Sequence, residues 1–182
     1  MINNPLLKST YDQLSTIEHC LEKDFKHVRT NKAYLDNLVP QNLRGVHSKK
    51  MDDACKFIDT VSTAAYESGV VILIATFESI AFDKYKNTYG NLKAVVKNNS
   101  SKPLSFYSAR EKLVNDSYDK LSAILKLIDG HITMSLHANL EIIKNYRDYL
   151  AHGKRFSAPP STKFTLYEIA KILDEVLLEI EN

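Results

Sequence analysis

Glycine and proline are scarce in this chain of 182 residues, which has five of each. Each therefore makes up about 3% of the chain, against usual frequencies of about 7% and about 5%. Folds built from many short strands need these residues at their turns. The scarcity argues against an all-β fold and favours all-α structure. The length suits a single domain over residues 1–182.

The sequence also has few cysteines, no large excess of charge and no long apolar run. Cys20 and Cys55 lack the spacing of a metal or redox motif, and no secretory leader precedes them. The longest strictly apolar run, residues 70–75, is far shorter than the ~20 residues that cross a bilayer. The formal net charge is +2. We therefore expect a cytoplasmic protein without a membrane partner, on which any site for a polyanion is a local patch.

The common motifs of nucleotide, metal and serine chemistry are absent. There is no GxxxxGK[ST], GxGxxG, HExxH or GxSxG motif, and no cysteine pair at zinc spacing. His131 and His137 lie six residues apart, and His19 and His27 lie eight apart, so neither pair has the i, i+4 spacing of helical metal ligands. We expect neither a metal nor a cofactor.

Apolar residues at helical spacing predict a bundle of five to six helices. The first helix is predicted over 9–36 with Ser9 as its N-cap, and the second begins near Ser48. A third is predicted after Gly69, and its residues 70–81 are typical of the most buried helix of a bundle.

Further helices are predicted in the second half of the chain. One follows Pro103, another covers about 134–151, and the last follows the capping box of Thr165 and Glu168. The heptad seam of this last helix could serve a partner or the core. The main residues predicted to face the core are Leu14, Ile17, Leu21, Val28, Ile58, Val70, Ile74, Phe77, Ala81, Leu121, Ile124, Leu125, Ile128, Leu136, Leu140, Ile143, Leu150, Leu166, Ile169, Leu173, Val176 and Ile180.

Arg147 interrupts the apolar stripe of the helix predicted over 134–151. At 100° per residue it lies within about 20° of the stripe formed by Leu136, Leu140 and Ile143. Burying an unpaired charge costs several kcal/mol. Arg147 therefore needs either a carboxylate partner, as in a structural ion pair, or a half-open pocket for an anion.

His152 follows Arg147 by five residues, at the predicted end of the same helix, and Gly153 is placed to end it. On a continuous helix the two side chains are about 140° apart, so they do not share a face. They can cooperate in two ways. Either the helix ends before the histidine and the chain turns back, or two copies of the helix meet and each supplies part of the site.

The sequence around this helix end is basic and aromatic, which suits single-stranded nucleic acid. Cations pair with phosphates, and aromatic rings stack on bases with about 1 to 3 kcal/mol per base. A solvated helix end whose cations oppose the helix dipole is the other interpretation. The residues predicted to bind RNA are Lys144, Tyr149, Lys154, Arg155 and Phe156.

Residues 147–153, RDYLAHG, resemble the Rx4-6H motif of HEPN domains in the variant R-[ND]-x-x-A-H-G. The resemblance covers roughly residues 50–180 and includes the helical context and the basic, aromatic loop after the motif. The first helix is less diagnostic. The segment ATFES, residues 75–79, resembles an earlier HEPN helix that carries an acidic residue facing the site, here Glu78. The closest group is that of stand-alone bacterial HEPN proteins related to the RiboL-PSP-associated group.

The resemblance implies a metal-independent endoribonuclease of the toxin–antitoxin or phage-defence type, acting on single-stranded RNA in the cleft of a homodimer. His152 would be the general acid or base, Arg147 would hold the scissile phosphate, and Asp148 would orient either of them. Glu78 would be a supporting residue or only a structural partner. The products would carry 2′,3′-cyclic phosphate and 5′-hydroxyl ends, and a cognate antitoxin protein is a further implied partner.

Two other classes of function remain open on the sequence alone. The chain could be a HEPN-like module that binds RNA or a nucleotide without cutting it. It could also be a helical interaction protein whose last helix pairs with a partner and in which Arg147 belongs to a buried ion pair.

Overall fold

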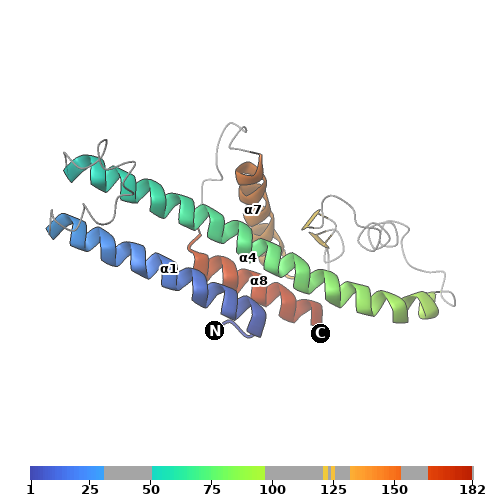
Figure 1. Ribbon diagram of the computed structural model, residues 1–182. Helices are drawn as coiled ribbons and strands as arrows, with labels where there is room; N and C mark the ends of the chain where they lie inside the picture. The colour runs from blue at the N-terminus through green and yellow to red at the C-terminus, as the bar shows by residue number, and fades with distance from the viewer. Residues whose placement is uncertain (31–50, 97–120, 123, 126–131, 153–163, 182) are drawn as a thin grey trace.

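The structure is a computed structural model that describes residues 1–30, 51–96, 121–122, 124–125, 132–152 and 164–181. These residues form four helices and no strand (Figure 1), namely α1 (Pro5–Thr30), α4 (Met51–Val96), α7 (Met134–Ala151) and α8 (Leu166–Glu181). Residues 121–122 and 124–125 are also helical. The all-α prediction is therefore confirmed, with four helices in the described part of the chain where the sequence predicts five to six.

Helices α1 and α4 run antiparallel, side by side, and the other two helices pack against this pair (Figure 1). Thr10 lies opposite Thr76, and Leu14 lies opposite Gly69, so the residue number rises along α1 as it falls along α4. Helix α8 contacts α1, α4 and α7, while α7 contacts α4 and α8. Helices α4 and α8 thus each contact all three of the other helices.

The first helix begins four residues earlier than predicted. The Oδ1 atom of Asn4 accepts hydrogen bonds from the backbone N–H groups of Leu6 and Leu7, both at 3.1 Å. Asn4 is therefore the N-cap in place of Ser9. Pro5 takes the first helical position, where its missing N–H costs nothing. The predicted end, residues 31–36, lies outside the described residues.

Helix α4 runs through Gly69, so the second and third predicted helices are one continuous helix, and the predicted boundary at this glycine is wrong. Gly69 serves close packing. A Cβ atom at this position would lie 2.9 Å from Cδ1 and 3.2 Å from Cδ2 of the buried Leu166 side chain. The missing side chain lets α8 approach α4.

Replacing Gly69 with valine is expected to lower the free energy of unfolding by about 1 to 3 kcal/mol, because the added atoms overpack the contact with Leu166. Urea denaturation measures this change. Ala64→Val is the matched control, since Ala64 is exposed on the same helix. Equal stabilities of the two variants would contradict the packing role of Gly69.

Most of the predicted core is buried, and it joins all four helices. Phe77, Leu140 and Leu173 are among the fully buried side chains. Ile17 is an exception, since it is 50% exposed. Leu21 and Leu150 are only half-buried, while the side chains of Val28 and Ile180 and the whole of Ile128 lie outside the described part. Buried as predicted are Leu14, Ile58, Val70, Ile74, Phe77, Ala81, Leu121, Ile124, Leu125, Leu136, Leu140, Ile143, Leu166, Ile169, Leu173 and Val176.

The capping box at the start of α8 is confirmed. One carboxylate oxygen of Glu168 accepts hydrogen bonds from the backbone N–H of Thr165 at 2.8 Å and from its hydroxyl at 2.9 Å. In return, the Thr165 hydroxyl accepts the backbone N–H of Glu168 at 3.2 Å. These bonds, first the one from the Thr165 backbone, lower the pKa of Glu168 against a smaller opposing effect of burial. The seam that follows is buried inside the chain.

Thr165→Ala is expected to destabilise the protein by about 1 kcal/mol at neutral pH, the usual cost of losing an N-cap. Because the pKa of Glu168 is lower in the folded state, its stabilising effect is present above its unfolded pKa and is lost as the pH falls through the folded pKa. The difference in melting temperature between wild type and variant should therefore shrink in acid. A difference that grows on acidification would contradict this.

A buried carboxylate attaches the N-terminal segment to α8. Asp174 is 1% exposed, and its Oδ2 atom accepts the backbone N–H of Asn3 at 2.8 Å and the Asn3 side-chain amide at 3.0 Å. Its Oδ1 atom accepts the backbone N–H of Asn4 at 2.7 Å. Asp174 therefore fixes the start of α1 on α8.

One described segment, Cys55–Lys84 of α4, is long and apolar enough to cross a membrane, with a mean hydropathy of 1.4 and 33% of its most apolar stretch buried. The longest strictly apolar run within it is bounded by Gly69 and Thr76, so a search for such runs misses the segment. Core helices of soluble proteins share this length and composition. The segment is therefore weak support for a membrane span.

Candidate functional site

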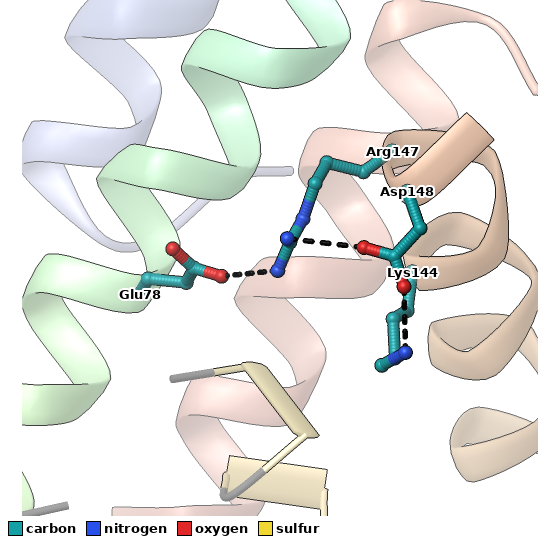
Figure 2. Close-up of polar contacts among 4 residues, drawn as sticks. All are labelled: Glu78, Lys144, Arg147 and Asp148. Atoms are coloured by element: carbon teal, nitrogen blue, oxygen red, sulfur yellow. Dashed lines mark hydrogen bonds and ion pairs between the residues drawn. The ribbon is translucent and has the colours of Figure 1, made fainter. Parts of the chain in front are cut away.

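Arg147 lies between two carboxylates, one from another helix and one from its own (Figure 2). Its Nη2 atom is 2.8 Å from Oε1 of Glu78 on α4, and its Nη1 atom is 3.0 Å from Oδ1 of Asp148. The other Asp148 oxygen is 2.7 Å from Nζ of Lys144, one turn earlier on α7. We call Glu78, Lys144, Arg147 and Asp148 the ion cluster.

The ion cluster arises from helix spacing and from the packing of α7 on α4. Lys144 and Asp148 have i, i+4 spacing and so lie on one side of α7. Arg147 lies within the apolar stripe of α7, and it meets Glu78 of α4 (Figure 2). A carboxylate partner, one of the two environments expected for Arg147, is thus present, and Glu78 supplies it.

The ion cluster is partly buried and formally neutral. The exposed fractions of its four side chains lie between 19% and 27%. Two cations face two carboxylates, so each charge has an opposite charge within hydrogen-bond distance. This pairing offsets the cost of removing the charges from water. A phosphate that binds Arg147 would therefore compete with a carboxylate.

We expect a double-mutant cycle of Glu78→Gln and Arg147→Met to give a coupling energy of about 1 kcal/mol, typical of a partly buried ion pair. Chemical denaturation of the four proteins measures it. If the two substitutions changed stability additively, the contact of Glu78 with Arg147 would have no energetic weight.

His152 is the C-cap of α7, and its side chain is exposed. Its backbone N–H still donates to the carbonyl oxygen of Asp148 at 3.0 Å, the i−4 bond of a helix. Helix α7 ends at Ala151, directly before His152. Its backbone therefore fits both arrangements that the sequence leaves open.

Tyr149 belongs to a row of three aromatic rings that links α7 to α4. Its ring is stacked on that of Tyr146 with centroids 6.3 Å apart, and Tyr146 lies 6.3 Å from Tyr66. The Tyr66 hydroxyl donates to the carbonyl oxygen of Phe164. Burial, with smaller effects of Tyr146, Glu18 and Glu168, raises the pKa of Tyr66 to about 12. The packing of Tyr146 and Tyr66 behind Tyr149 was not predicted, although the i, i+3 spacing of Tyr146 and Tyr149 was a signal for part of it.

The other residues that the sequence predicts to bind RNA are either paired in the structure or lie outside its described residues. Lys144 is predicted to bind RNA, yet in the structure it pairs with Asp148. Lys154, Arg155 and Phe156 lie outside the described residues. In the part of the chain that the structure describes, no group of three or more His, Cys, Asp or Glu side chains could hold a metal ion.

Comparison of the chain with models of known protein families, with curated proteins and with solved structures finds no match. The site is therefore interpreted from its own residues.

Proposed function

We propose that this protein is a metal-independent endoribonuclease of the HEPN type, which cuts single-stranded RNA in a cleft between two copies of the chain. One observation carries the proposal. Arg147, on a helix facing α4, lies against the carboxylate of Glu78, and an exposed histidine follows at the end of the same helix. RNA transesterification needs no metal ion when side chains transfer the protons and a cation holds the phosphate, since the 2′-hydroxyl of the substrate is the nucleophile.

In the proposed reaction the 2′-oxygen attacks the adjacent phosphorus atom and the bond to the 5′-oxygen breaks. A base takes the proton of the 2′-hydroxyl, and an acid gives a proton to the leaving 5′-oxygen. His152 of each copy can perform one of these transfers because an imidazole titrates near neutral pH. The products are a 2′,3′-cyclic phosphate and a 5′-hydroxyl, and no metal or cofactor takes part.

Arg147 stabilises the negative charge that grows on the phosphate oxygens in this reaction. The ion cluster offers a route for it to do so. Asp148 contacts both Arg147 and Lys144. When the Arg147 guanidinium leaves Asp148 to bind the phosphate, the Asp148 carboxylate therefore stays paired with Lys144. Glu78 meanwhile holds the other end of the guanidinium. Asp148 is thus an exchangeable partner and Glu78 a positioning residue.

The RNA strand would extend from this point over Tyr149, with its ring available to stack on a base. Lys154, Arg155 and Phe156 follow directly in the sequence and would continue the basic and aromatic track. Such a protein would act in the cytoplasm as a toxin or in phage defence, under control of a cognate antitoxin.

A helical interaction protein is the second candidate, and the paired state of Arg147 is the observation in its favour. The contacts of Arg147 with Glu78 and Asp148 are also those of a structural ion pair. In that case Arg147→Met would be tolerated or stabilising, since apolar replacements of buried ion pairs often are.

Incubation of the purified protein with radiolabelled single-stranded RNA in EDTA, with binding measured in parallel over a salt series, separates these functions. The proposed enzyme cuts the RNA. RNA affinity that falls steeply with salt, without cleavage, would instead identify a binding module. If the protein neither cuts nor binds the RNA, the helical interaction protein is the function that remains.

A further inference from the structure

The outer side of α4 is apolar although it does not face the core. Helices that are apolar on all sides are usually buried on all sides. Yet only 33% of the most apolar stretch within Cys55–Lys84 is buried, and Val71 and Ile72 are 39% and 46% exposed. The composition of α4 therefore calls for a cover that the described part of this chain does not supply.

Helix α1 extends this apolar surface. Leu6 and Ile17 are 54% and 50% exposed, and both project from the side of α1 on which Thr10 meets Thr76 of α4. At 100° per residue, the outward residues of α1 fall within about 60° of one another and those of α4 within about 100°. We call the resulting surface the α1–α4 face. It consists of Leu6, Thr10, Gln13 and Ile17 from α1, with Ser68, Val71, Ile72, Ala75 and Ser79 from α4.

We propose that the α1–α4 face binds the same face of a second copy in a dimer with two-fold symmetry. Side chains near a two-fold axis meet their own copies, so a charge there would face a like charge. No residue of the face is charged. Its serine and alanine side chains are small enough to let two helix pairs approach closely, and Ile17 and Ile72 supply apolar area to bury.

The size of the face is that of a small but specific interface. Two helices, each about 10 Å wide, exposed over about 20 to 25 Å give a footprint of about 500 Å² per copy. Two copies would together bury about 1,000 Å², the lower end for a specific complex. We therefore expect a reversible dimer whose dissociation constant lies in the micromolar range.

The charges around the face favour a second copy over a membrane or a nucleic acid. Between Lys56 and Lys84 the only charged side chains of α4 are acidic, namely Asp59, Glu67, Glu78 and Asp83. Asp59 and Asp83, which are both exposed, would repel anionic lipid headgroups and phosphates. The face also lacks the basic and aromatic rim of helices that bind membrane surfaces.

The α1–α4 face borders the ion cluster. Val71 and Glu78 are seven residues apart and so lie on one side of α4. A dimer through this face would place the two ion clusters at its rim. The inference rests on the proposed function only because the proposed ribonuclease requires two copies of the chain. The contact itself follows from the surface of α1 and α4.

Sedimentation velocity over a concentration series tests the proposal. Wild type should change from monomer to dimer across micromolar concentrations. Ile72→Glu and Ile17→Glu should each raise the dissociation constant at least tenfold while circular dichroism and melting temperature stay unchanged. Met134→Glu is the control, because Met134 is almost fully exposed on α7, away from the face.

A wild type that stays monomeric, or a dimer that Ile72→Glu leaves intact, would overturn the proposal. Co-sedimentation of wild type, but not Ile72→Glu, with anionic vesicles would also overturn it and assign the face to a membrane. The RNA assay is read separately. A wild type that forms the dimer but does not cut RNA would count against the ribonuclease. A protein that cuts RNA, and whose dimer is not weakened by Ile72→Glu, would count against this face alone.

Discussion

His152→Ala is expected to reduce the rate of RNA cleavage by at least a hundredfold, since positioned general acids and bases contribute about 10² to 10⁴. The imidazole is exposed at the end of α7, so its removal leaves no cavity and the fold should be unchanged. Single-turnover cleavage of a labelled oligonucleotide measures the rate. RNA affinity should change little, because the proposed role of the histidine is proton transfer and not RNA binding.

His137→Ala is the matched control for this prediction. His137 lies on the same helix, is half-buried, and belongs to none of the proposed roles. Its replacement should leave the cleavage rate within about threefold of wild type. Equal loss of activity in both variants would show that the effect of His152→Ala comes from the helix and not from the imidazole.

The largest expected loss of stability comes from Asp174→Ala, which should lower the free energy of unfolding by about 3 kcal/mol or more. The side chain is 1% exposed and accepts hydrogen bonds from Asn3 and Asn4 that involve three donors. Its removal leaves these donors without their acceptor, and each hydrogen bond to a charged group is worth about 1.5 to 3 kcal/mol. The N-cap at Asn4 would be loosened as well.

Urea denaturation of Asp174→Ala and Glu175→Ala side by side measures this effect. Glu175 is the next residue and carries the same charge, but it is half exposed and pairs with Lys171 only at 3.5 Å. Such surface pairs contribute about 0 to 1 kcal/mol. Similar losses in the two variants would contradict the anchoring role of Asp174.

The sequence predicts those parts of the fold that depend on local signals. The bounds of α7 follow from its apolar stripe and from Gly153, and the start of α8 follows from the capping box of Thr165 and Glu168. The need of Arg147 for a carboxylate also follows from its angular position. These features are set within a few residues of the chain, and so a pattern can reveal them.

Features that depend on contacts between distant segments are not predictable in this way. Gly69 resembles a helix boundary, but its role is to admit Leu166 from α8. Asp174 looks like one more polar residue of an amphipathic helix until Asn3 and Asn4 are placed against it. Ile17 fits the apolar stripe of α1, yet it projects beyond the core. For Gly69 and Asp174 the deciding partner is far away in the sequence.

Cleavage of one single-stranded RNA and of its copy with a single 2′-deoxy substitution at the cut site, both in EDTA, is the most direct test of the central claim. We expect wild type to cut the RNA to a 2′,3′-cyclic phosphate and a 5′-hydroxyl and to leave the substituted bond intact. We expect Arg147→Ala and His152→Ala to cut the RNA at least a hundredfold more slowly. Cleavage of the deoxy-substituted bond, or no cleavage of the RNA by wild type, would contradict the claim.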